Sequence, residues 1–178
     1  MEDVDGTNGS SWTTPKYVLN NQSCKLLFHC FEEETKMRGI IKHIKWVGKK
    51  IWEKENSVCF LFKDNFIEFH MNQDPIDSNS FSTDFDVNIV LTDNNDESRI
   101  ASTTEFLRSN NFPNHTRSVL AIHKHTPVPV NVEFERIVRQ NLDAKTNWSF
   151  QYYDSLSQSG EFSCALIEDM INIANNRQ

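Results

Sequence analysis

The chain has 178 residues, a formal net charge of −7 and 38% hydrophobic residues, which is enough for one domain with a small core. Thirteen phenylalanines enlarge that core, because each buried ring removes a large apolar area from water. The acidity argues against a protein that coats duplex DNA nonspecifically, but it does not exclude a local basic groove.

The four cysteines form no Cys-x-x-Cys pair, and no apolar run of signal-peptide length follows Met1. No apolar segment reaches the roughly 20 residues that a membrane-spanning helix requires. The sequence therefore predicts a reducing, intracellular location in the nucleus or the cytoplasm, without membrane contact.

Residues 1–15 are rich in Gly, Ser, Thr and Asp and predict a flexible leader before a single globular domain over residues 16–178. Short runs of β-branched and aromatic residues, separated by polar turns, then indicate strands. In chain order these runs are Leu26–Phe31 (a strand or a short helix), Ile40–Val47, Ile51–Trp52, Ser57–Phe62, Phe66–His70, Phe85–Leu91 and Arg99–Ala101. Lys63–Asn65 has the composition of a turn, which predicts a hairpin between the strands on either side.

Residues 105–178 predict a mixed β/α extension. Pro127 and Pro129 confine the chain from Pro127 to Val132 to a sheet edge or a linker. The other predicted elements are strands at Val119–Ile122 and Trp148–Tyr153, a helix at Val132–Leu142 (with a strand at Phe134–Ile137 as the alternative) and an amphipathic helix at Phe162–Ala174.

The segment Lys36–Lys54 is basic within an acidic chain. It holds seven of the 18 Lys and Arg residues, two of the four Trp and a single acid, Glu53. Bases stack on aromatic rings and phosphates pair with cations, so this composition indicates a surface for single-stranded nucleic acid. The alternative interpretation places Trp46 and Trp52 in the core and the lysines on a solvated face.

Residues 38–104 resemble the cold-shock and S1-like branch of the OB fold. Gly39–Ile44 is similar to the opening strand of that family, and Val58–Phe62 and Phe66–His70 are similar to its aromatic second and third strands. Phe85–Leu91 and Arg99–Ala101 stand where the fourth and closing strands occur. The Gly-Phe-Gly-Phe spacing of a cold-shock domain is absent, and a Tudor or other SH3-like barrel has a similar series of short strands.

This resemblance implies a mainly β, β-rich α+β fold: a small five-stranded OB-like barrel over residues 38–104, with extra strands and a C-terminal helix. In the family, exposed aromatic side chains on the second and third strands stack bases. The expected nucleic-acid-binding residues are Lys42, Lys45, Trp46, Lys49, Lys50, Trp52, Lys54, Phe66 and His70.

Patterns for catalysis or metal binding are weak. His123–Thr126 contains a His-x-His, but no second His-x-Thr or His-x-Ser completes a two-histidine phosphoesterase. Cys24, His29 and Cys30 lack the paired short spacing of a zinc site and indicate buried thiols instead. The acids between Asp84 and Glu97 are typical of a strand edge and a turn. The Gly-x-Ser-x-Gly, Walker A and Rossmann patterns are absent. The sequence therefore predicts no enzyme, no metal and no cofactor.

The C-terminal helix has two interpretations. Phe162, Leu166 and Met170 lie on its apolar face, which predicts either packing against the rest of the domain or a helix that binds a protein partner. The first functional hypothesis is a non-catalytic OB-like module that binds RNA or single-stranded DNA within a larger complex. The alternative is a protein-interaction or scaffold subunit of a ribonucleoprotein, chromatin or telomere-type assembly, with no direct nucleic-acid contact. In that case the C-terminal helix or the edge strand at Pro127–Pro129 meets the protein partner.

Overall fold

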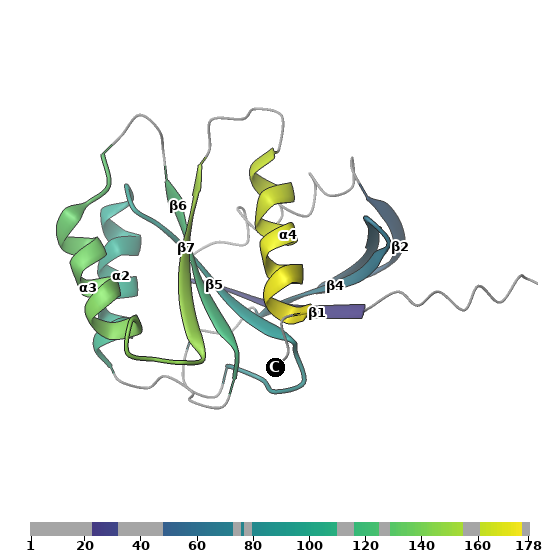
Figure 1. Cartoon of the computed structure of the whole chain (residues 1–178), viewed down its shortest axis with the longest axis horizontal. Helices are drawn as coiled ribbons and strands as arrows, with labels where there is room; N and C mark the ends of the chain where they lie inside the picture. The colour runs from purple at the N-terminus through teal and green to yellow at the C-terminus, as the bar shows by residue number, and fades with distance from the viewer. Residues whose placement is uncertain are drawn as a thin grey trace, which may run out of the picture.

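The computed structural model describes residues 23–31, 48–72, 76, 80–109, 116–124, 129–154 and 161–175. The expected leader and the predicted strand Ile40–Val47 lie outside these ranges. The described strands form one mixed sheet in the order β2-β3-β4-β1-β5-β6-β7, with three described helices beside it (Figure 1). The strands are β1 (Ser23–Cys30), β2 (Lys49–Lys54), β3 (Ser57–Phe62), β4 (Asn65–Asn72), β5 (Val87–Asp93), β6 (Ser118–Lys124) and β7 (Trp148–Asp154). The helices are α2 (Glu97–Arg108), α3 (Val132–Leu142) and α4 (Glu161–Asn175).

The mainly β character is confirmed, whereas the described strands form an open sheet, so the barrel expected over residues 38–104 is not confirmed. Its central strand is β1, which lies outside the expected barrel segment and pairs in parallel with both β4 and β5. Insertion of β1 keeps β4 and β5 apart, so these two strands cannot follow each other around a small barrel. Parallel β6 and β7 then extend the sheet beyond β5.

The hairpin predicted around Lys63–Asn65 is confirmed. β3 and β4 pair antiparallel from Ser57 opposite His70 to Phe62 opposite Asn65. The two residues between them, Lys63 and Asp64, have φ values of 44° and 62°. Positive φ at both central residues matches the right-handed twist of the flanking strands, so the turn itself sets the register of β4.

The strand expected at Arg99–Ala101 is wrong, because these residues lie in α2. The side chain of Asp96 accepts hydrogen bonds from the backbone N–H groups of Ser98 and Arg99 and begins the helix. This cap satisfies two donors that a strand would have directed to a neighbour. The helices predicted at Val132–Leu142 and Phe162–Ala174 are both confirmed as α3 and α4.

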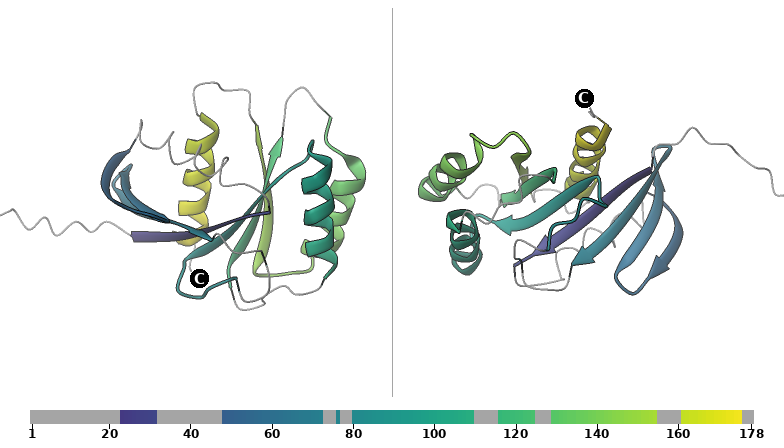
Figure 2. Two further views of the ribbon diagram at one scale, coloured as in Figure 1. Left: turned by 180° about the vertical axis from the view of Figure 1, so that it is seen from behind. Right: turned by 90° about the horizontal axis from the view of Figure 1, so that it is seen from below.

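The helices cover both faces of the sheet. α4 packs on one face, next to β1, β5 and β7, and Ile167, Met170 and Ile171 belong to a buried cluster that extends to β3 and β4. α2 and α3 pack on the other face over β5, β6 and β7, and Figures 1 and 2 show them across the sheet from α4. Every residue of β5 is buried, as expected for a strand covered on both sides. No helix among the described residues is long and apolar enough to cross a membrane.

Candidate functional site

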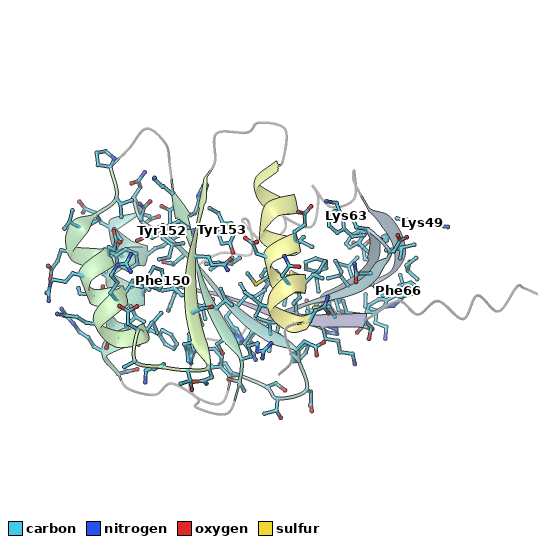
Figure 3. The ribbon with its side chains drawn as sticks, viewed as in Figure 1. Lys49, Lys63, Phe66, Phe150, Tyr152 and Tyr153 are labelled. Atoms are coloured by element: carbon cyan, nitrogen blue, oxygen red, sulfur yellow. The ribbon has the colours of Figure 1, made fainter. Side chains whose placement is uncertain are left out.

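The structure describes six of the nine expected nucleic-acid-binding residues. Lys42, Lys45 and Trp46 lie outside the described residues. Lys49, Lys50 and Lys54 are exposed on β2, while Trp52, Phe66 and His70 are partly exposed. Figure 3 shows Lys49 at the β2 end of the sheet, far from β7.

The register of β2 separates its lysines onto the two faces of the sheet. Lys50 lies opposite Phe60, whose side chain is in the core beneath α4, and its ammonium group forms a 2.7 Å ion pair with Glu53. Trp52 lies opposite Cys59, and a register shift between Lys50 and Trp52 marks a β-bulge. Because paired residues share a face, Trp52 lies on the side of the sheet that also carries α2 and α3.

Five of the six described residues meet on that second face. Lys49 pairs with Leu61, which in turn pairs with Phe66, and Lys54 pairs with Ser57, which pairs with His70. Phe85 joins them from the segment before β5. We name this surface the Trp52 face and define it by Lys49, Trp52, Lys54, Phe66, His70 and Phe85.

The rings of the Trp52 face form a connected row. The Trp52 and His70 ring centroids are 6.5 Å apart, and those of His70 and Phe85 are 4.9 Å apart, both edge-to-face. The ammonium nitrogen of Lys54 lies 5.5 Å from the Trp52 ring centroid, within cation–π range. Glu68 completes the row, with its carboxylate 3.2 Å from His70 Nε2. This arrangement offers a partner flat apolar rings with one cation beside them.

The charge around the Trp52 face is balanced. Residues 48–72, which form β2, β3, β4 and their turns, carry four lysines and four acids. One lysine is paired with Glu53, and another, Lys63, forms an ion pair with Glu168 of α4. The described part of the expected basic segment, residues 48–54, keeps three lysines against one acid, and the acids of the adjoining residues 55–72 balance this excess.

Met170, one of the three residues expected to bind a partner, is buried. Its side chain has no exposed surface and lies in the core between α4 and the sheet. The side chains of Phe162 and Leu166 lie outside what the structure describes, although their backbone is part of α4. The alternative interpretation, in which the helix packs on the domain, is the one that the structure supports at Met170.

The histidines and acids considered for chemistry have structural contacts. Asp93 Oδ2 lies 3.3 Å from His123 Nδ1, and Asp93 Oδ1 accepts a hydrogen bond from the backbone N–H of Asn95. Asp96 caps α2. Cys24 is buried in the core, and no group of three metal-ligating side chains occurs among the described residues.

A buried polar network was missed at the sequence level. His29 is fully buried on β1, where its ring stacks on Phe81 with centroids 4.6 Å apart. Asn72 Nδ2 lies 3.2 Å from His29 Nδ1, and Asn88 Oδ1 lies 3.3 Å from His29 Nε2. Asn88 Oδ1 also accepts a hydrogen bond from the backbone N–H of Ser82, and Asn88 Nδ2 donates one to the Ser82 carbonyl. The available signal was a polar residue in the apolar run Leu26–Phe31, which indicates a buried side chain that needs partners.

Comparison with known proteins identifies the fold. No family model matches the chain, and no curated protein matches it. A solved structure from Plasmodium falciparum, described as nucleolar GTP-binding protein 1, matches with a TM-score of 0.58 and 11% identity, over 89% of this chain and 90% of that one. The two chains share a fold. In all, 502 chains of solved structures match, so the fold is widespread and does not by itself name a function.

Proposed function

We propose that this chain is a non-catalytic protein-interaction subunit, built on a nucleotide-binding fold that lacks the phosphate-binding segment. The observation that carries the proposal is the sequence after β1, the strand at the centre of the sheet. The P-loop has the form Gly-x-x-x-x-Gly-Lys-Ser/Thr and directly follows a strand. Here the segment after β1, Phe31–Met37, reads F-E-E-E-T-K-M.

This substitution removes the physical basis of phosphate binding. In a P-loop the glycines let backbone N–H groups approach the phosphates, and no residue with a side chain adopts the required backbone as readily. Phe31–Met37 contains no glycine. Three consecutive glutamates instead add negative charge, which repels a nucleotide triphosphate. The similar structure is described as a GTP-binding protein, and this chain has no glycine-rich P-loop sequence after β1.

The Trp52 face supports a protein partner. Tryptophan and other aromatic residues are enriched at protein interfaces, and partly exposed rings supply buried area at small entropic cost. The balanced charge of residues 48–72 suits a protein better than a polyanion, which requires an excess of cations. This surface is also clear of α4, which occupies the opposite face.

Nucleotide titration tests the non-catalytic part of the proposal. We expect no saturable binding of fluorescent GTP or ATP with Mg²⁺ by the full chain, measured by anisotropy and confirmed by calorimetry. Stoichiometric binding at micromolar nucleotide would contradict the proposal, since P-loop proteins hold their nucleotides in or below that range.

Replacing Trp52 tests the interaction surface. Immobilised full chain should capture protein from nuclease-treated native extract, and Trp52→Ala should weaken that capture about tenfold or more, as expected for a central aromatic anchor. Ile51→Ala is the matched control, because Ile51 is 45% exposed on the same strand but lies outside the aromatic row. Equal capture by the Trp52→Ala protein would remove the Trp52 face from the proposal.

A second candidate function, binding of single-stranded RNA or DNA, is favoured by one observation. Lys49 and Lys54 lie on the same face as Trp52, and the Lys54 ammonium group lies over its ring. A base that stacked on Trp52 would place its phosphates near these lysines.

Charge reversal separates this candidate from the first. If nucleic acid binds here, Lys49→Glu with Lys54→Glu should weaken binding of a labelled oligonucleotide at low salt by about tenfold or more and flatten its salt dependence. Lys50→Glu is the control, since Lys50 lies on the opposite face of β2. Anisotropy that shows no binding by the wild-type chain, or equal losses in both variants, would rule out this candidate.

A further inference from the structure

The two edges of the described sheet differ in how they are protected. β2, at one edge, carries three lysines and a bulge, and both features discourage another strand from pairing with an edge. β7, at the other edge, has the sequence W-S-F-Q-Y-Y-D, with no lysine, no proline and no register shift against β6. Within the described sheet β7 therefore lacks the edge-protecting features of β2 and has the sequence of a strand that can pair.

The outward backbone groups of β7 follow from its pairing with β6. The N–H of Ser118 donates to the carbonyl of Asn147, so residue 147 directs its polar groups toward β6. Backbone groups alternate along a strand, which directs Ser149, Gln151 and Tyr153 the same way. The N–H and C=O groups of the alternate residues point away from the sheet; these residues are Trp148, Phe150, Tyr152 and Asp154.

We propose that β7 pairs antiparallel with β7 of a second copy of this chain, about a two-fold axis at Gln151. In this register Phe150 lies opposite Tyr152 of the second copy, and Trp148 lies opposite Asp154. Each of these residues directs its backbone groups outward, so each pair exchanges two hydrogen bonds. Gln151 is the midpoint of β7, and centring there uses the full length of the strand.

The side chains suit this self-pairing. Figure 3 shows Phe150 and Tyr152 on the α3 side of β7 and Tyr153 on the α4 side. Phe150 and Tyr152 are partly exposed, and their rings already contact each other with centroids 6.1 Å apart. The two-fold axis places Phe150 beside Tyr152 of the second copy, a cross-strand aromatic pair of the kind that stabilises sheets.

Charge complementarity favours a second copy over an unrelated strand. α3 packs on the face of β7 that carries Phe150, and the Arg139 guanidinium lies 5.1 Å from the Phe150 ring. A two-fold axis perpendicular to the sheet keeps both α3 helices on one face and runs them antiparallel. The acidic first turn of one helix then faces the last turn of the other, so the ion pairs that Glu133 and Glu135 form within their own helix, with Arg136 and Arg139, are joined by the opposite charges of the second helix.

The assembly also closes on itself. Edge-to-edge pairing joins the β7 strands of both copies, and the joined sheet of described strands then ends on each side at a lysine-bearing β2. Such an isologous contact gives a dimer and not a filament. The Trp52 faces stand at the far ends of the joined sheet, so the inference is independent of the proposed function.

Gln151 variants test the dimer. The full chain should sediment and scatter as a species of about twice 20.7 kDa, and dissociate on dilution. Gln151→Lys should give a monomer, because the two-fold axis places the Cβ atoms of the two lysines roughly 5 Å apart and like charges directly opposite each other destabilise strand pairing. Gln151→Glu should do the same, and it keeps an acceptor for the Tyr153 hydroxyl that now donates to Gln151 Oε1.

Mixing the two variants is the decisive step. Equal amounts of the Gln151→Lys and Gln151→Glu proteins should restore the dimer, which a folding defect in either variant would not permit. A wild-type monomer at roughly 100 μM would overturn the proposal and leave the edge to a strand from another protein. A dimer that survives both single variants, or two monomers that fail to associate when mixed, would overturn it as well.

Discussion

Met170→Ala should lower the free energy of unfolding by about 3 kcal/mol, within the usual cost of deleting a fully buried methionine side chain. Met170 has no exposed surface and lies among buried residues of α4, β1, β3 and β4. Truncation of the Met170 side chain leaves a cavity, because the close-packed residues around it cannot move far enough to fill the space. Urea denaturation followed by circular dichroism measures the change as a lower midpoint at constant slope.

The same helix supplies the control for this prediction. Asn172 is exposed two residues further along α4, and Asn172→Ala should change stability by less than about 0.5 kcal/mol. Capture of a protein partner by folded Met170→Ala protein should equal that of the wild type. A selective loss of capture with unchanged stability would return Met170 to the partner-binding role expected from the sequence.

The helices were predictable because their pattern is local. α3 and α4 each repeat apolar residues at helical spacing, and packing on a single neighbouring surface is enough to use that pattern. Arg99–Ala101 failed for the opposite reason. Three residues with a single β-branched side chain are weak evidence for a strand. The side chain of Asp96 caps a helix that begins at Glu97 and includes them.

The positions of several strands were predictable from the sequence, but the order in which they pair in the sheet was not. Alternation and turn composition locate β3, β4 and their hairpin, since these depend on neighbours in the chain. Parallel pairing joins strands that are distant in sequence, and nothing local in β1 indicates that it lies between β4 and β5. A series of short strands is therefore compatible with a barrel and with an open sheet alike.

The Trp52 face shows the same division. Phe66 and His70 are four residues apart on β4, so alternation puts them on one face of the strand, and the pairing with β3 agrees. Phe85 lies in the segment before β5 and not on the strand of His70, so the periodicity of β4 does not predict the contact between these two rings. The His29 network is still less local, because His29 reaches partners 43 and 59 residues away.

The unfolding free energy should fall by about 3 kcal/mol between pH 7 and pH 4 through His29 alone. Desolvation by burial lowers the pKa of His29 from 6.5 to about 4, partly opposed by its hydrogen bond with Asn88. Asn72 Nδ2 is a hydrogen-bond donor, so His29 Nδ1 accepts from it and is unprotonated. His29 Nε2 therefore carries the ring proton and donates a hydrogen bond to Asn88 Oδ1. If Nδ1 were also protonated, two hydrogen-bond donors, His29 Nδ1 and Asn72 Nδ2, would face each other at a fully buried imidazole.

The sign follows from linkage. The unfolded histidine binds its proton near pH 6.5, whereas the folded one resists until about pH 4. The stabilisation is complete above pH 6.5, falls by about 1.4 kcal/mol for each pH unit below it, and levels off below pH 4. Urea midpoints measured across this range report the loss, and the Hε1 resonance of His29 should titrate near pH 4.

His29→Phe isolates this contribution from the other groups that titrate in acid. Phenylalanine keeps the stack on Phe81 but leaves Asn72 and Asn88 without the ring nitrogens, so the variant should be less stable at pH 7. Its stability should decline less steeply than that of the wild type between pH 6.5 and pH 4, and the difference between the two curves should approach 3 kcal/mol. Parallel curves, or a His29 resonance that titrates near 6.5, would show that the imidazole is not held neutral by burial and that the network joining β4, β1 and β5 accepts a charge.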